Sequence, residues 1–122
     1  MAQVLNQAYT DILNFINPNG TGNTFNGIEL LNSGTSQVQA TDADSRVTVT
    51  SNTGSNPYTL QITVSPSDGD VTSGDTFDES RIYNGDPSSA SPVTARESFT
   101  SVTLQENDDE LVVDHDIEVP QI

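Results

Sequence analysis

RVTVTSNTGSNPYTLQITVS, residues 46–65, is the stretch that decides the fold. Apolar residues alternate with threonine or glutamine in 46–51 and again in 58–65, and the polar segment 52–57 separates the two runs. A period of two is typical of a strand with one buried and one solvent-facing side. In the second run the inward positions are predicted to be Tyr58, Leu60, Ile62 and Val64. The stretch therefore predicts an antiparallel hairpin.

Further strands are predicted on both sides of this hairpin. FNGIELL (25–31) precedes a turn at Asn32-Ser33-Gly34-Thr35, and 77–84 follows an acidic loop at 66–76. After an exposed, mobile loop at 85–92, the strand in 93–104 changes phase between Phe99 and Val102, which calls for a bulge. ELVVDHDIEV (110–119) closes the chain, with its odd-numbered residues on one face and three acids on the other.

The N-terminal residues predict the one helix, over 2–16, before a loop at 17–24 that begins with Asn17-Pro18. Its apolar face consists of Val4, Leu5, Ala8, Tyr9, Ile12, Phe15 and Ile16. A short amphipathic helix is marginal alone, so this face is predicted to be the assembly interface. The expected architecture is a mainly β, antiparallel β-sandwich or small barrel in one domain, 1–122: helix in 1–16, loop 17–24 and sandwich 25–122.

The chain is strongly acidic: it has 18 Asp and Glu residues and only 3 Arg, and its formal net charge is −15. Such a chain has no basic patch for nucleic acid and is not attracted to anionic membranes. The absence of cysteine excludes disulfides and thiol chemistry. Concentrated salt would screen the self-repulsion, so the composition favours a halophilic source; an acidic protein of an ordinary host is the alternative.

Few residues are candidates for chemistry. His115 is the single histidine, flanked by Asp114 and Asp116. Neighbours along a strand point to opposite faces, so neither aspartate can orient the ring, and a buried structural histidine is expected rather than a general base.

Three carboxylates in the acidic loop, those of Asp68, Asp70 and Asp75, lie beside Gly69 and Gly74 and supply oxygens of the kind calcium prefers. Their spacing fits no EF-hand, so no metal is expected there. The turn at Asp108-Asp109-Glu110 is interpreted as a hairpin between the last two strands.

Modification and enzyme motifs are equally sparse. Asn19-Gly20-Thr21 is a glycosylation sequon in a predicted loop. The chain has no G-x-S-x-G elbow, no phosphate-cradling glycine loop and no lysine. Neither an enzyme nor a cofactor is therefore expected.

Taken in order, the segments resemble small virion proteins of tailed bacteriophages, of the tail-fibre or tail-collar type. The corresponding stretches are AYTDILNFI, FNGIELLNSG, RVTVTSNTGSNPYTLQITV, FDESRIYNGD, ESFTSVTLQENDDEL and VVDHDIEV, which together cover most of the chain. His115 stands where that family usually has an aromatic residue, and the loops here are more acidic. The resemblance implies a β-rich virion component that self-associates.

The expected function is that of a non-enzymatic virion structural protein adapted to high salt, in a tail, a fibre base or a capsid surface. Its expected partners are copies of itself and other virion structural proteins. Two alternatives stay open: a host-surface-binding adhesion module that uses loops 66–76 and 85–92, and a surface β-domain of a halophilic cell.

Overall fold

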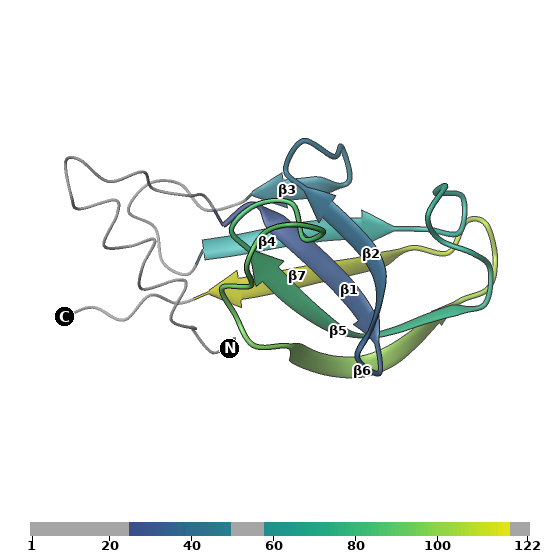
Figure 1. The fold of residues 1–122 in the computed structure, drawn as a ribbon. Coiled ribbons are helices and arrows are strands. Elements are labelled where there is room, and N and C mark those ends of the chain that lie inside the picture. The colour runs from purple at the N-terminus through teal and green to yellow at the C-terminus, as the bar shows by residue number, and fades with distance from the viewer. Residues whose placement is uncertain (1–24, 50–57, 118–122) are drawn as a thin grey trace, which may run out of the picture.

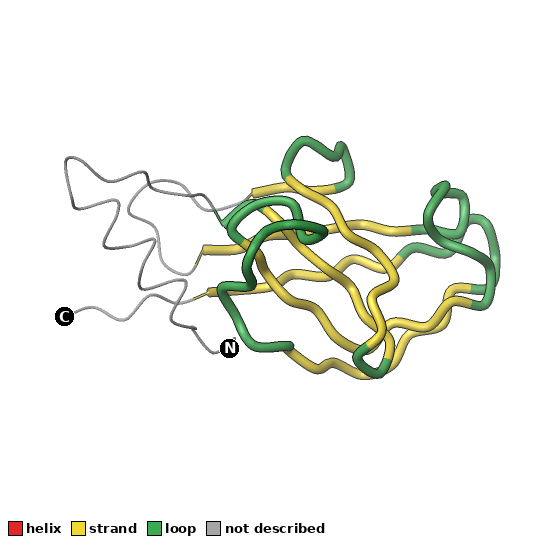
Figure 2. The backbone as a smooth tube through the Cα atoms, in the orientation of Figure 1, coloured by secondary structure: helices red, strands yellow, loops and turns green. Residues whose placement is uncertain are grey.

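The computed structural model describes residues 25–49 and 58–117, which form seven antiparallel strands in two sheets (Figures 1 and 2). The strands are β1 (Gly27–Asn32), β2 (Thr35–Thr41), β3 (Val47–Val49), β4 (Tyr58–Val64), β5 (Asp75–Tyr83), β6 (Glu97–Leu104) and β7 (Leu111–Ile117). One sheet has the order β2-β1-β5-β6 and the other the order β3-β4-β7. The predicted mainly β, antiparallel architecture is confirmed for these residues, whereas the predicted helix 2–16 lies outside them.

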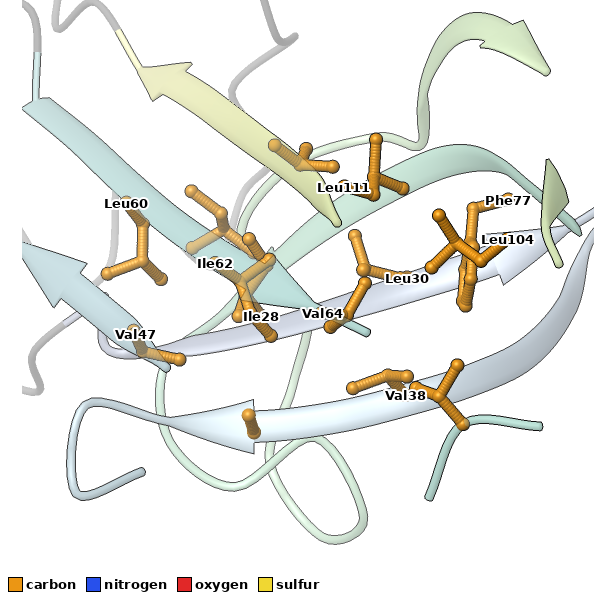
Figure 3. Close-up of a cluster of buried hydrophobic side chains, with 14 of the residues drawn as sticks. Ile28, Leu30, Val38, Val47, Leu60, Ile62, Val64, Phe77, Leu104 and Leu111 are labelled. Atoms are coloured by element: carbon orange, nitrogen blue, oxygen red, sulfur yellow. The ribbon is translucent and has the colours of Figure 1, made fainter. Parts of the chain in front are cut away.

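The inward side chains of both sheets meet in one apolar cluster (Figure 3). Ile28 and Leu30 of β1 lie in it with Leu60 and Ile62 of β4, and none of the four is accessible to solvent. Two sheets that bury their inner faces against each other form a β-sandwich. β1, β2, β4 and β7 contribute alternate residues to this cluster, as a period of two predicts.

The predicted hairpin is confirmed in its strands and their direction. β3 and β4 are antiparallel, with Val47 opposite Ile62 and Val49 opposite Leu60. Leu60, Ile62 and Val64 are buried as predicted, while Val49 at the end of the short β3 is 39% exposed. The turn between the strands and the side chain of Tyr58 lie outside the described part of the chain.

One strand was not predicted, namely β2. It pairs with β1 through a two-residue turn in which Ser33 has φ +49° and Gly34 has φ +84°. Positive φ at both central residues is characteristic of the hairpin turns whose twist matches that of the strands. The amide of Ser33 donates to Asp78 Oδ1 at 2.9 Å, and that of Gly34 donates to Glu79 Oε1 at 2.7 Å. Two carboxylates of β5 therefore hold this turn.

β1 is buried on both faces, and it begins at a glycine, Gly27, that has another part of the backbone packed against it. A Cβ atom at Gly27 would lie 1.8 Å from the carbonyl oxygen of Gly85. The backbone after β5 therefore crosses close over β1, and only glycine leaves room for it. The loop 85–92 that was expected to be exposed is tied down in part: Asn84 N–H donates to Ser91 O at 3.1 Å, and Pro87 is buried.

The irregularity predicted in 93–104 is confirmed. Phe77 faces Val102 and Glu79 faces Ser98, so two steps along β5 correspond to four along β6. The extra residues let both Phe99 and Val102 pack against the core despite their different phase.

β7 shows the predicted alternation of buried and exposed residues over its whole length. The prediction that Asp108-Asp109-Glu110 closes a hairpin was wrong, because β6 pairs with β5 and β7 pairs with β4. The turn instead carries the chain from one sheet to the other. Glu118 and Val119 lie outside the described residues.

Candidate functional site

The residues most suggestive of catalysis are Ser80 of β5 and His115 of β7, which meet across the two sheets. Ser80 Oγ and His115 Nδ1 are 2.7 Å apart, within hydrogen-bond distance. His115 is 1% exposed and Ser80 is 2% exposed. A serine and a histidine at this distance would form a nucleophile–base pair if a substrate could reach them.

The surroundings of this pair oppose catalysis. His115 Nε2 is buried and has no hydrogen-bond partner among the described residues, so no carboxylate orients the ring. Burial lowers the pKa of His115 to about 4, while the charges of Glu97 and Asp116 act in the opposite direction. The ring is thus neutral near pH 7 and sealed from solvent. The expected burial of His115 is confirmed.

A second polar centre surrounds Arg46, just before β3. Its guanidinium makes five hydrogen bonds, which equals the number of N–H donors it has. Two go to Asp44 and two to Asp70, each pair bidentate, and one goes to Asp68 at 3.0 Å. Hydrogen bonding to Arg46 also lowers the pKa of Asp44.

Arg46 binds two of the carboxylates in the acidic loop 66–76, where the sequence offered oxygens of the kind that calcium prefers. Asp68 and Asp70 turn toward Arg46, and Asp75 accepts the Thr72 amide at 2.8 Å. Asp109 likewise accepts the amides of Gln105 and Glu106, both at 2.9 Å. Within 25–49 and 58–117, no three His, Cys, Asp or Glu side chains are grouped to hold a metal ion.

The outer face of β1 carries a third polar group, which sequence analysis missed. Glu29 is buried and accepts hydrogen bonds from Tyr83 Oη at 2.9 Å and Gln39 Nε2 at 3.1 Å. Burial and this carboxylate raise the pKa of Tyr83. Arg81 lies over the Tyr83 ring, 6.0 Å from its centroid, and donates to Thr94 O. The group ties β1, β2 and β5 together on the side away from the core.

An open hollow of about 390 Å³ lies beside the β1–β2 turn. It is lined by Ser33, Gly34, Asp78, Glu79, Arg96, Ser98, Phe99 and Ser101. The carboxylates of Asp78 and Glu79 already hold the turn amides, and Arg96 Nε lies 4.0 Å from Glu79 Oε2. Most of the charged groups around the hollow therefore have partners within the fold.

Two predicted sites lie outside the described residues: the seven apolar residues of the predicted helix, Val4 to Ile16, and the sequon at Asn19. Among the described residues, no helix has the length and apolar character needed to cross a membrane.

Comparison with known proteins gives no relative: no family model, no curated protein and no solved structure matches this chain.

Proposed function

We propose that this protein is a non-enzymatic structural component of the virion of a tailed virus, adapted to high salt and assembling with copies of itself and with other virion proteins. The non-enzymatic part of the proposal is supported by the positions of the side chains that could act in catalysis. Ser80 and His115 are buried in the core. The carboxylates of Asp44, Asp68 and Asp70 form ion pairs with Arg46. The resemblance to tail-fibre and tail-collar proteins supports the virion part.

Incorporation into particles tests the proposed function. Wild-type protein is expected to co-purify with virions at a fixed copy number, measured by quantitative mass spectrometry. Ile12→Asp, on the face predicted to be the assembly interface, should reduce that copy number at least tenfold. Asn14→Asp, on the opposite side of the predicted helix, adds the same charge and should leave it unchanged.

Absence of the wild-type protein from purified virions would contradict the virion proposal. Equal incorporation of the Ile12 and Asn14 variants would remove only the role of the predicted helix. Saturable binding of the purified protein to host cells, without incorporation, would favour the adhesion alternative.

Adaptation to salt predicts a large dependence of thermal stability on chloride. At 50 mM salt the Debye length exceeds 10 Å and fifteen net negative charges repel, whereas at 2 M the repulsion is almost fully screened. If screening adds about 2 kcal/mol, the melting temperature should rise by roughly 8 °C between 50 mM and 2 M NaCl. Calorimetry or circular dichroism measures the shift.

A less charged variant provides the control for this prediction. Asp108→Asn with Glu110→Gln removes two exposed negative charges from the turn before β7, so its gain from salt should be smaller. Equal melting temperatures in low and high chloride would overturn the salt adaptation and leave the virion proposal standing.

A further inference from the structure

Of the three arginines, Arg96 is the one whose guanidinium makes no hydrogen bond within the described part of the chain. The sequence contains no lysine. All five N–H donors of Arg46 are used by its aspartates, and Arg81 donates to Thr94 O. Arg96 Nε lies 4.0 Å from Glu79 Oε2, which is too far for a hydrogen bond. The donors of Arg96 are therefore available to a partner.

This guanidinium has a defined place in the hollow of about 390 Å³ beside the β1–β2 turn (the Arg96 hollow). A Cβ atom at Gly34 would lie 2.7 Å from Arg96 Nη1, so the arginine lies directly over the turn. Asp78 and Glu79 are bonded to the turn amides, and residues 99–101 leave the regular ladder with β5 beside them. A positioned guanidinium with free donors fits a carboxylate, which it can bind through two parallel hydrogen bonds.

The acidic side chains that have no partner in the fold are gathered in one turn. Among the described residues, the other Asp and Glu side chains each take part in an interaction, whereas those of Glu106, Asp108 and Glu110 do not. All three are exposed in the 105–110 turn between β6 and β7. Asp109 accepts two amides of this turn and so fixes its shape. The turn presents three free carboxylates to solvent.

The Arg96 hollow and the 105–110 turn lie at opposite ends of β6. Arg96 directly precedes this strand, and the turn directly follows it (Figure 1). The strand has eight residues, which corresponds to a separation of roughly 20 Å. One copy of the chain therefore cannot place its own turn in its own hollow, whereas a neighbouring copy can.

Charge favours a second copy of this chain as the source of the carboxylate. Each copy carries both halves of the contact, one free guanidinium and one turn with free carboxylates, so the contact can repeat from copy to copy. Two chains of net charge −15 repel each other, and Arg96 supplies the attraction that orients one on the other. At 1 M salt the Debye length is about 3 Å, so the long-range repulsion is screened while a directly bonded pair persists.

We infer that the Arg96 hollow is the docking site for the 105–110 turn of a second copy, with a carboxylate of that turn bound to the Arg96 guanidinium. The contact joins two different surfaces, so it is head-to-tail and generates a ring or a filament. A single exposed ion pair contributes little affinity, so the contact sets the orientation of neighbouring copies while other surfaces supply most of the binding energy. The inference rests on the self-association in the proposed function and identifies one surface of it.

Cross-linking between two single-cysteine proteins tests this contact, because the natural chain has no cysteine. Ser101→Cys places a thiol at the hollow, and Asn107→Cys places one in the turn. Mixed in 2 M NaCl with a short bismaleimide, they should give a 101–107 heterodimer, which a tag on one protein distinguishes from homodimers. The yield should be several times that obtained when Val112→Cys replaces Asn107→Cys. Val112 is 52% exposed on β7, so a thiol there is also accessible.

Removal of the guanidinium provides the second arm of this test. Arg96→Gln, introduced into the Ser101→Cys protein, should lower the heterodimer yield about tenfold, because a charge-assisted hydrogen-bonded pair is lost. The Arg96 side chain is 47% exposed and its one ion pair is long, so this variant should keep the wild-type circular dichroism spectrum.

Neutralising the turn should have the same effect from the other side. The substitutions, made in the Asn107→Cys protein, are Glu106→Gln, Asp108→Asn and Glu110→Gln. Asp114→Asn with Asp116→Asn is the matched control, because it removes negative charge from β7 outside the turn. The control reduces the repulsion between copies and should leave the yield unchanged or raise it.

Three results would overturn the assignment of the Arg96 hollow: a yield no higher than that with Val112→Cys, a yield that Arg96→Gln leaves unchanged, or a yield that rises when the turn is neutralised. Wild-type protein present in virions at a fixed copy number would in each case leave the proposed function standing. Efficient 101–107 cross-linking of a protein that is absent from virions would support the contact and contradict the virion proposal, so the two failures are distinguishable.

Discussion

Arg46→Ala is expected to lower the free energy of unfolding by about 3 kcal/mol, the lower end of the range for removing one partner of a buried ion pair, because the Arg46 cluster is only partly buried. The Arg46 side chain is only 19% exposed, and it neutralises three carboxylates from two segments, the β2–β3 turn and the loop after β4. Without it, Asp44, Asp68 and Asp70 are left close together with like charge. Urea unfolding at pH 7 measures the loss.

Arg46→Lys separates charge from geometry. A lysine restores the positive charge but has three donors on one nitrogen, and it cannot make two bidentate pairs at once. We expect it to recover about 1 kcal/mol of the loss. Arg96→Ala is the matched control, since Arg96 is 47% exposed and 4.0 Å from Glu79, and it should cost less than about 0.5 kcal/mol.

Salt gives a further check on the Arg46 cluster. Part of the Arg46→Ala loss is repulsion among three carboxylates, and screening weakens that part, so the loss should shrink between 50 mM and 2 M NaCl. A loss below 1 kcal/mol at both salt concentrations would show that the cluster does not hold the two segments together.

Burial could be predicted residue by residue for the strands in which apolar and polar residues alternate, although the exposed Val112 of β7 departs from the pattern. In β7, Val113, His115 and Ile117 are buried while Asp114 and Asp116 are exposed, and the sequence already shows this order. His115 could be placed in the core for the same reason. Alternation within one strand is a local property, so the sequence displays it directly.

β2 was missed because only two of its residues, Val38 and Ala40, are buried apolar side chains. Its alternation is therefore short, and its outer face is polar. A usable signal existed in Ser33-Gly34, since this dipeptide between two extended runs indicates a two-residue hairpin turn. By itself, Asn32-Ser33-Gly34-Thr35 predicts the end of one strand and does not indicate where the next one begins.

The polar centres could not be predicted, because each joins residues that are distant in sequence. Arg46 lies 22 residues from Asp68 and 24 from Asp70, and Ser80 lies 35 residues from His115. No spacing rule within a strand connects such positions. Asp68 and Asp70 could be recognised as carboxylates in a turn, but the guanidinium that they bind could be identified only once β3 and the loop after β4 were placed together.

The second large effect is expected on acidification and arises from His115. In the unfolded chain the imidazole has its ordinary pKa of 6.5, and in the folded protein burial lowers that pKa to about 4. Above pH 6.5 both states are neutral and the stability is complete. Below pH 6.5 the unfolded state takes up the proton first, so stability falls as the pH drops toward 4. At 1.36 kcal/mol for each pH unit, the total loss is about 3 kcal/mol.

A double variant isolates this contribution from the many carboxylates that titrate in the same range. His115→Phe with Ser80→Ala removes the ionisable ring and the hydroxyl that it faces, and it leaves no buried polar atom of that pair without a partner. Both proteins keep the same Asp and Glu residues, so the difference between their unfolding free energies reports the histidine alone.

At pH 7.5 the double variant should be at least as stable as the wild type, because the buried Nε2 without a hydrogen bond is gone. By pH 5 the difference should have grown by about 2 kcal/mol in favour of the variant. Urea unfolding in 2 M NaCl across this range measures it. If the difference in unfolding free energy between the two proteins stays constant from pH 7.5 to pH 5, His115 is protonated as readily in the native protein as in the unfolded chain. His115 would then be open to solvent, and the reasoning that removes Ser80 and His115 from the catalytic candidates would fail with it.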